Sequence, residues 1–230
     1  MSGMNDDLAS RHAVVDHARR MNALGINQGK SGNVSIRARS AATTGDSSGF
    51  LITPSGLPYE TMSADDIVLV RWDGSYQAAD GREPSSEWRL HRDIYQARPE
   101  AVAIIHAHAM FATTLACLDT AIPAFHYMVA VAGGVDIRCA PYATFGTQEL
   151  SDAAVRALDG RRACLHSHHG MTVFGRGLPE TLALAVEVET LAAMYWRALQ
   201  LGSPSLLSAE QMSEVLDRFR DYGQPRGGPG

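Results

Sequence analysis

Two histidines end an apolar stretch of the chain, in the segment 102–108 (VAIIHAH). The branched apolar residues before them predict a strand, and strand side chains alternate between faces, so His106 and His108 are expected on one face. Neutral imidazole is a common zinc ligand, and a pair on a rigid strand supplies two ligands. The alternative interpretation is that two histidines simply end a strand.

A second histidine cluster, His166, His168 and His169, precedes Gly170 at the end of another apolar stretch. Neighbouring side chains on a strand face opposite ways, so at most one or two of these imidazoles can join the first pair, and the spacing does not decide which. Three protein ligands with an open fourth position are typical of a catalytic zinc site. The alternative is a set of surface histidines at a strand end.

Three short segments could bind an anion. Ser85 and Ser86 precede Glu87 where a helix is expected to start, and hydroxyls with free N–H groups at a helix N-terminus bind anions. Ordinary capping by the serines, with Glu87 on the helix dipole, is the alternative. The segments 29–33 (GKSGN) and 53–56 (TPSG) are either phosphate-binding loops or turns, and neither has the Walker spacing. Together the three segments indicate an anionic substrate.

The elements that must position these residues follow from apolar periodicity and turn signals. Helices are predicted over residues 8–24, 87–96, 148–158 and 179–201, and after Ser208, which forms a capping-box pair with Gln211. Strands are predicted over 32–37, 50–53, 67–72, from Tyr76, over 101–108, and over 163–174 with a break at Gly170. The segment 40–49 is expected to be a mobile hairpin loop. The hairpin signals imply antiparallel pairs, so the fold is predicted to be α/β, with a central mixed or antiparallel sheet and helices on its faces.

Composition limits the class of protein. A net charge of -5 and a pI near 6.0 argue against a nucleic-acid partner, and three cysteines are too few and too widely spaced for a disulfide framework or a thiolate zinc site. The acidic N-terminus and the lack of a long apolar run argue against a signal peptide and a membrane span. We therefore expect a cytoplasmic protein with one domain over 1–223 and a disordered tail over 224–230.

Jointly, several blocks resemble the class II aldolase/adducin-head family. These blocks are 25–37 (GINQGKSGNVSIR), 51–60 (LITPSGLPYE), 84–89 (PSSEWR), 106–108 (HAH), 122–128 (IPAFHYM), 139–146 (CAPYATFG) and 168–170 (HHG). They occur in the family's order from about residue 10 to Gly223. The resemblance implies an α/β fold with a central, mainly antiparallel sheet flanked by helices on both faces. It also implies a homotetramer with active sites between adjacent subunits.

The resemblance assigns roles to individual residues. It implies a zinc ion, with manganese, cobalt or another divalent metal as alternatives, held by His106, His108 and His169, with Glu87 as a further ligand and proton carrier. His168 is then a neighbour of the site. Tyr127 would reach in from the adjacent subunit as a proton donor. The substrate phosphate would lie against Gly32, Asn33, Ser55, Gly56, Ser85 and Ser86, and the aldehyde portion against Phe145, Phe219 and Tyr222.

The activity implied is reversible cleavage of a ketose 1-phosphate to dihydroxyacetone phosphate and an aldehyde. L-fuculose 1-phosphate and the 5-deoxyribulose or 5-methylthioribulose 1-phosphates of salvage pathways are the candidate substrates. A sugar-phosphate epimerase or dehydratase of the same fold is an alternative, although the epimerases have aspartate in place of Glu87. A non-catalytic interaction domain like the adducin head is another alternative, although it lacks the metal set. The segment 38–49 is longer than in the relatives, and the chain beyond Tyr222 differs from them.

Overall fold

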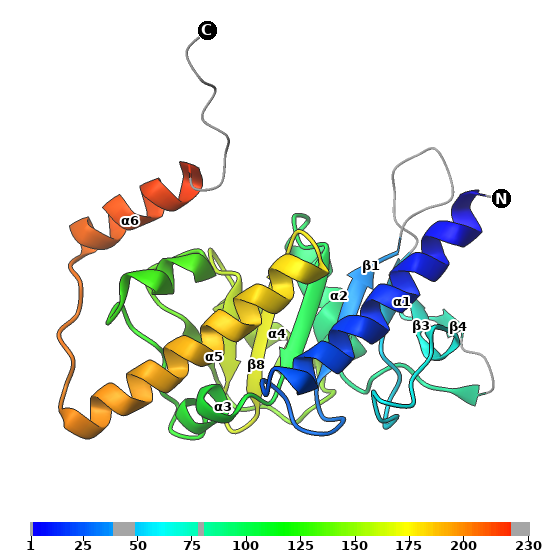
Figure 1. The fold of residues 1–230 in the computed structure, drawn as a ribbon, viewed down its shortest axis with the longest axis horizontal. Coiled ribbons are helices and arrows are strands. Elements are labelled where there is room, and N and C mark those ends of the chain that lie inside the picture. The colour runs from blue at the N-terminus through cyan, green and yellow to red at the C-terminus, as the bar shows by residue number, and fades with distance from the viewer. Residues whose placement is uncertain (1, 39–48, 78–80, 222–230) are drawn as a thin grey trace, which may run out of the picture.

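One eight-stranded sheet forms the centre of the molecule in the computed structural model, which describes residues 2–38, 49–77 and 81–221 (Figure 1). The strands lie in the order β4-β3-β2-β1-β5-β8-β7-β6, and every neighbouring pair is antiparallel except β6 and β7. Their bounds are β1 (Asn33–Arg37), β2 (Gly49–Ile52), β3 (Val68–Arg71), β4 (Tyr76–Gln77), β5 (Ala103–Ala107), β6 (Arg138–Ala140), β7 (Ala163–His166) and β8 (Gly170–Gly175).

Helices cover both faces of this sheet. In the described part of the chain the α-helices are α1 (Ser2–Ala23), α2 (Trp88–Ala97), α3 (Met110–Ala116), α4 (Gln148–Ala157), α5 (Leu178–Leu201) and α6 (Ala209–Asp221), and the 3-10 helices include η1 (Ala64–Asp66) and η3 (Tyr127–Ala132). α1 and α5 run across the near face in Figure 1, and α3 packs with them. α2 and α4 pack together on the other face. The predicted α/β fold, with a mainly antiparallel sheet between helices, is confirmed.

β5 lies at the centre of the sheet and separates two apolar cores. Ala103, Ile105 and Ala107 belong to the core under α1, α3 and α5, whereas Ile104 belongs to the core under α2 and α4. This alternation is the period of two expected for a strand buried on both faces. The alternation directs His106 to the α2 side of the sheet, from one of its two central strands.

The structure corrects one predicted strand. Residues 163–174 are not one strand with a break, because the chain reverses between β7 and β8 and the two strands pair as an antiparallel hairpin. The three residues Ser167, His168 and His169 form the turn, and His168 takes a left-handed φ of 52°. Both strands are buried, so apolar residues continue through the reversal and periodicity does not show it. Neither periodicity nor turn signals predicted α3, η3 or β6.

α6 begins as predicted, with a capping box. The Ser208 N–H donates to Gln211 Oε1 (2.8 Å), and the Gln211 N–H donates to Ser208 Oγ (3.2 Å). The helix lies apart from the sheet at the left of Figure 1 and contacts η3. Of the predicted segments, the loop residues 40–48 and the tail 224–230 lie outside the described residues, as does Tyr222.

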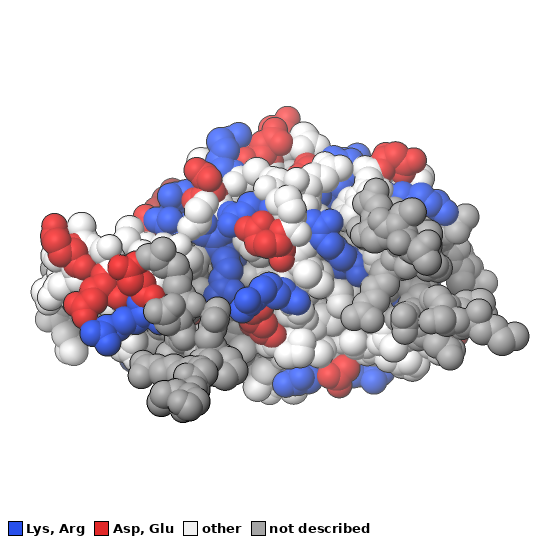
Figure 2. All heavy atoms as spheres, turned by 90° about the horizontal axis from the view of Figure 1, so that it is seen from above, with Lys and Arg blue, Asp and Glu red and all other residues white. Residues whose placement is uncertain are grey.

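Charges of both signs are interspersed on the face that is seen from above (Figure 2). Several charged residues pair within the described part of the chain, as Arg162 does with Glu180 (2.6 Å) and Arg161 with Asp136 (2.6 Å). Within the described residues, every helix falls short of the length and apolar character that crossing a bilayer requires.

Candidate active site

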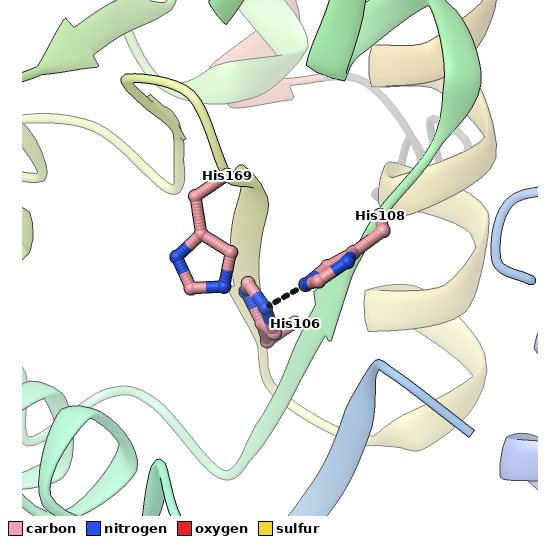
Figure 3. Close-up of side chains that lie close together, drawn as sticks. All are labelled: His106, His108 and His169. Carbon is pink, nitrogen blue, oxygen red and sulfur yellow. Dashed lines mark hydrogen bonds between the residues drawn. The ribbon is translucent and has the colours of Figure 1, made fainter. Parts of the chain in front are cut away.

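Three imidazoles meet at one end of β5 (Figure 3). His106 is the penultimate residue of the strand, His108 follows it, and His169 comes from the turn between β7 and β8. Their candidate ligand nitrogens all lie within 4.8 Å of one another, and the Nε2 atoms of His106 and His108 are 3.1 Å apart. One cation could therefore contact all three rings. His166 and His168 lie outside this cluster.

Glu87 lies beside the three imidazoles, at the start of α2. Its Oε2 is 3.3 Å from His106 Nε2, and its Oε1 is 3.3 Å from His169 Nε2. The side chain is buried, and burial raises the pKa of Glu87 to about 7. Among the described residues, Oε1 has no hydrogen-bond partner, and burying an unpaired carboxylate oxygen costs free energy. A cation among the three rings would compensate that oxygen, so the donor set fits a divalent metal.

The imidazoles are suited to act as neutral ligands. Burial lowers the pKa of His106, His108 and His169, the last to about 4, so each ring has a free lone pair near neutral pH. Thr172 Oγ1 lies 3.2 Å from His106 Nδ1, on the far side of the ring from the cluster. A hydrogen bond at Nδ1 leaves Nε2 free to bind a metal, and such second hydrogen bonds orient ligating histidines.

A cavity of about 250 Å³ opens onto the imidazoles. It is lined by Ser31, Ser86, Glu87, His108, Tyr142, Ala143, Phe145, His168 and His169. Ser86 and Phe145 were predicted to contact substrate, whereas Ser31 and Tyr142 were not, although both lie inside blocks that carry the family resemblance. The cavity therefore joins one predicted phosphate-binding residue and one predicted pocket residue to the metal cluster.

The three predicted anion-binding segments lie next to one another. The Ser85 N–H donates to Thr53 O and the Ser55 N–H donates to Glu83 O, both at 3.0 Å. Lys30 Nζ donates to Gly56 O (2.8 Å), and this bond joins the segment 29–33 to the segment 53–56. Gly32, Asn33 and Ser85 are buried behind this surface, whereas Ser55 and Gly56 are exposed on it.

Tyr127 and Phe219 lie elsewhere in the chain. Together they line a separate cavity of about 280 Å³ between η3 and α6, with Met128, Val215 and Arg218. The Tyr127 side chain is 50% exposed. Within one chain these two predicted site residues are therefore not brought to the histidine cluster.

Gly32 supports the segment that carries the histidines, and Gly32→Ala is expected to destabilise the fold by about 1–3 kcal/mol through overpacking. An added Cβ would lie 2.6 Å from His106 O and 2.7 Å from Asn27 Oδ1, which accepts the His108 N–H. Urea unfolding measures the loss. Gly177→Ala is the control, since the nearest atom to its Cβ, Pro179 Cδ, is 3.9 Å away. An equal loss in both variants would contradict the close approach.

A buried histidine behind the cluster should make stability depend on pH. Burial lowers the pKa of His91 to about 3, against about 6.5 in an unfolded chain. The unfolded state then binds more protons, so stability present above pH 6.5 is lost as pH falls toward 3. Between pH 7 and pH 5 the wild type should lose about 2 kcal/mol more than His91→Gln. Urea unfolding of both proteins at the two pH values tests this, and equal losses would contradict it.

Comparison with known proteins identifies what the chain resembles. Residues 12–196 match the family described as Class II Aldolase and Adducin N-terminal domain. The chain is 51% identical to a 5-methylthioribulose-1-phosphate/5-deoxyribulose-1-phosphate aldolase of Rhodospirillum rubrum, over 94% of this chain and 93% of that protein. It is 45% identical to the L-fuculose phosphate aldolase of Escherichia coli, over 91% and 94%. A solved structure of an L-fuculose 1-phosphate aldolase superposes with a TM-score of 0.85 at 36% identity, over 92% and 96%.

Proposed function

Because this chain belongs to the class II aldolase and adducin N-terminal domain family, we propose that it is a zinc-dependent lyase that reversibly cleaves a ketose 1-phosphate to dihydroxyacetone phosphate and an aldehyde. The observation that carries the proposal is the meeting of three neutral imidazoles with the buried Glu87 carboxylate, where His108, His169 and Glu87 line one cavity and His106 lies buried beside them. His106, His108 and His169 would hold the zinc ion, with Glu87 as a fourth ligand in the resting enzyme. The cation would act as a Lewis acid on the substrate carbonyl and on the charge left by C–C cleavage.

The protein's own groups would move the protons. In the cleavage direction the C4 hydroxyl loses its proton, the C3–C4 bond breaks, and the electron pair remains on C3. Glu87 would deliver a proton to C3, which completes dihydroxyacetone phosphate, and would remove it in the reverse direction. A pKa near 7 lets this carboxyl exist in both forms at neutral pH. Burial of Glu87 therefore favours proton transfer, because it raises the pKa of the carboxyl toward neutral pH.

Tyr127 would exchange the proton on the aldehyde oxygen from an adjacent subunit. Tyr127 is half-exposed and lies away from the histidine cluster of its own chain, so its hydroxyl could reach the active site of a second copy. We therefore propose a homotetramer whose active sites lie between subunits, each subunit being a single domain over residues 1–223. Phe219 would contribute to the substrate pocket from the same region.

The phosphate and aldehyde ends of the substrate would lie on different parts of the cavity. Ser86 and the neighbouring segments 31–33 and 55–56 would bind the phosphate through hydroxyl and N–H donors. Phe145, with Tyr142 beside it, would contact the aldehyde portion. The relatives named above act on 5-methylthioribulose, 5-deoxyribulose and fuculose phosphates, which differ at this end. The phosphate end alone does not discriminate among them.

The test is release of dihydroxyacetone phosphate by the zinc-loaded protein from each of these three ketose 1-phosphates. Chelator-sensitive release from at least one of them is expected, and the ranking of rates identifies the substrate. If none is cleaved while zinc is bound at one ion per chain, the proposal fails and an epimerase or dehydratase becomes the better assignment. The intact set of histidines with Glu87 argues against a non-catalytic interaction domain.

A further inference from the structure

A chain of buried hydrogen bonds leads from Glu87 into the core under α2. Asn33 Nδ2 donates to Glu87 Oε2 (2.9 Å), and Asn33 Oδ1 contacts His91 Nε2. On the other side of the ring, His91 Nδ1 lies 2.6 Å from Ser35 Oγ, which is 2.8 Å from the Tyr95 hydroxyl. All five side chains are buried. Breaking one of these hydrogen bonds would leave a buried polar group unpaired, which costs free energy, so the five side chains are held in place.

Two rigid elements build this chain. Asn33 and Ser35 are two residues apart on β1 and therefore face the same side of the sheet. His91 and Tyr95 are four residues apart on α2 and therefore lie on the same side of the helix. The network joins the strand to the helix that begins next to Glu87, so a change anywhere along it can reach the carboxylate.

The hydrogen bonds can run in only one direction while Glu87 is a carboxylate. A carboxylate only accepts, so the Asn33 amide must direct its NH₂ group at Glu87 and its oxygen at His91. That oxygen also only accepts, so His91 Nε2 must be the protonated nitrogen and Nδ1 must accept from the Ser35 hydroxyl. Ser35 Oγ in turn accepts from Tyr95.

His91 therefore determines which end of the Asn33 amide Glu87 meets. With His91 donating, the NH₂ group faces the carboxylate; with the amide turned over, its oxygen would face a second acceptor. Among the described residues, Asn33 is the side chain that donates a hydrogen bond to the Glu87 carboxylate. Without His91, the orientation of that donor would be lost.

We propose that His91 is a positioning residue for the aldol step: through Asn33 it holds the Glu87 carboxylate in a single orientation as a proton acceptor, and Ser35 and Tyr95 fix its tautomer. The inference rests on the proposed role of Glu87. It assigns to Asn33 a contact with the acid–base group in addition to any contact with the substrate phosphate. His91 itself touches neither substrate nor metal.

The test is a double-mutant cycle between His91 and Glu87. His91→Leu removes both ring nitrogens, and we expect kcat to fall about 10–100-fold while KM and bound zinc change less than about twofold. In a Glu87→Gln background the same substitution should change kcat less than about twofold, because the group it positions has already been removed. His91→Gln, which keeps an N–H donor, should recover part of the loss.

Two further variants keep the test decisive. Tyr95→Phe removes only the hydroxyl at the far end of the chain and should lower kcat in the same direction even if His91→Leu fails to fold. His17→Leu is the matched control, a buried histidine on α1 that is outside this network, and it should leave kcat unchanged.

Several outcomes would overturn the inference. These are an unchanged kcat in both His91→Leu and Tyr95→Phe, an equal fall of kcat in both Glu87 backgrounds, and an equal fall in His17→Leu. Full activity of Glu87→Gln alone would instead refute the proposed role of Glu87. The two failures are thus distinguishable.

Discussion

His169→Ala is expected to lose the divalent metal and, with it, aldolase turnover, whereas His168→Gly is expected to keep the metal. His169 supplies one of the three nitrogens of the cluster and lies 3.3 Å from Glu87. Loss of a residue that merely supports a metal ligand weakens metal binding about 10–100-fold, so loss of a proposed ligand should exceed about 100-fold. Metal content after dialysis and the rate of dihydroxyacetone phosphate release measure the two effects.

His168 is the matched control because it is the adjacent histidine in the same turn. Its φ of 52° is unfavourable for any residue with a Cβ and favourable for glycine. His168→Gly should therefore preserve or slightly raise the melting temperature while metal binding is retained. If His168→Gly lost the metal and His169→Ala retained it, the turn would supply the other imidazole and the proposed ligand set would be incorrect.

The turn also illustrates what the sequence could predict. Alternation along the predicted strand correctly predicted that His106 and His108 face one way, because His108 directly follows β5, the buried strand that contains His106. The same rule could not select among His166, His168 and His169, since a chain reversal separates the first from the last. Only the family resemblance singled out His169. Its position in the structure depends on the left-handed φ of His168, which no periodicity encodes.

Long-range contacts account for much of what could not be predicted. Asn33 and Glu87 are 54 residues apart, and Ser35 and His91 are 56 residues apart, yet each pair is in hydrogen-bond contact. Spacing rules act within one helix or strand, so they predict the members of each face but not which faces meet. For this reason the sequence predicts the helix that contains His91 but not the contacts of His91 with Asn33 and Ser35 on β1.

Glu87→Gln is expected to lower turnover by about 10²–10⁴-fold while the metal, the fold and the affinity for substrate are retained. The two side chains have nearly the same shape, and a glutamine oxygen can still accept the hydrogen bond from Asn33 Nδ2. What is lost is a group able to gain and release a proton near pH 7. Single-turnover release of dihydroxyacetone phosphate, zinc content and the melting temperature measure the three properties.

Glu83→Gln is the matched control, because Glu83 is an exposed carboxylate four residues earlier on the same segment. It removes the same charge without touching the cluster, and its turnover should stay within about twofold of the wild type, as expected for surface substitutions. Wild-type turnover in Glu87→Gln would refute the proton-transfer role. Loss of zinc in Glu87→Gln, with turnover restored by excess zinc, would assign Glu87 to metal binding alone. Glu87 is buried beside three imidazoles, and Asn33 Nδ2 donates to one of its oxygens while the other has no hydrogen-bond partner among the described residues. This environment suits a carboxyl that contacts the cation and also transfers a proton, and the zinc content of Glu87→Gln separates the two roles.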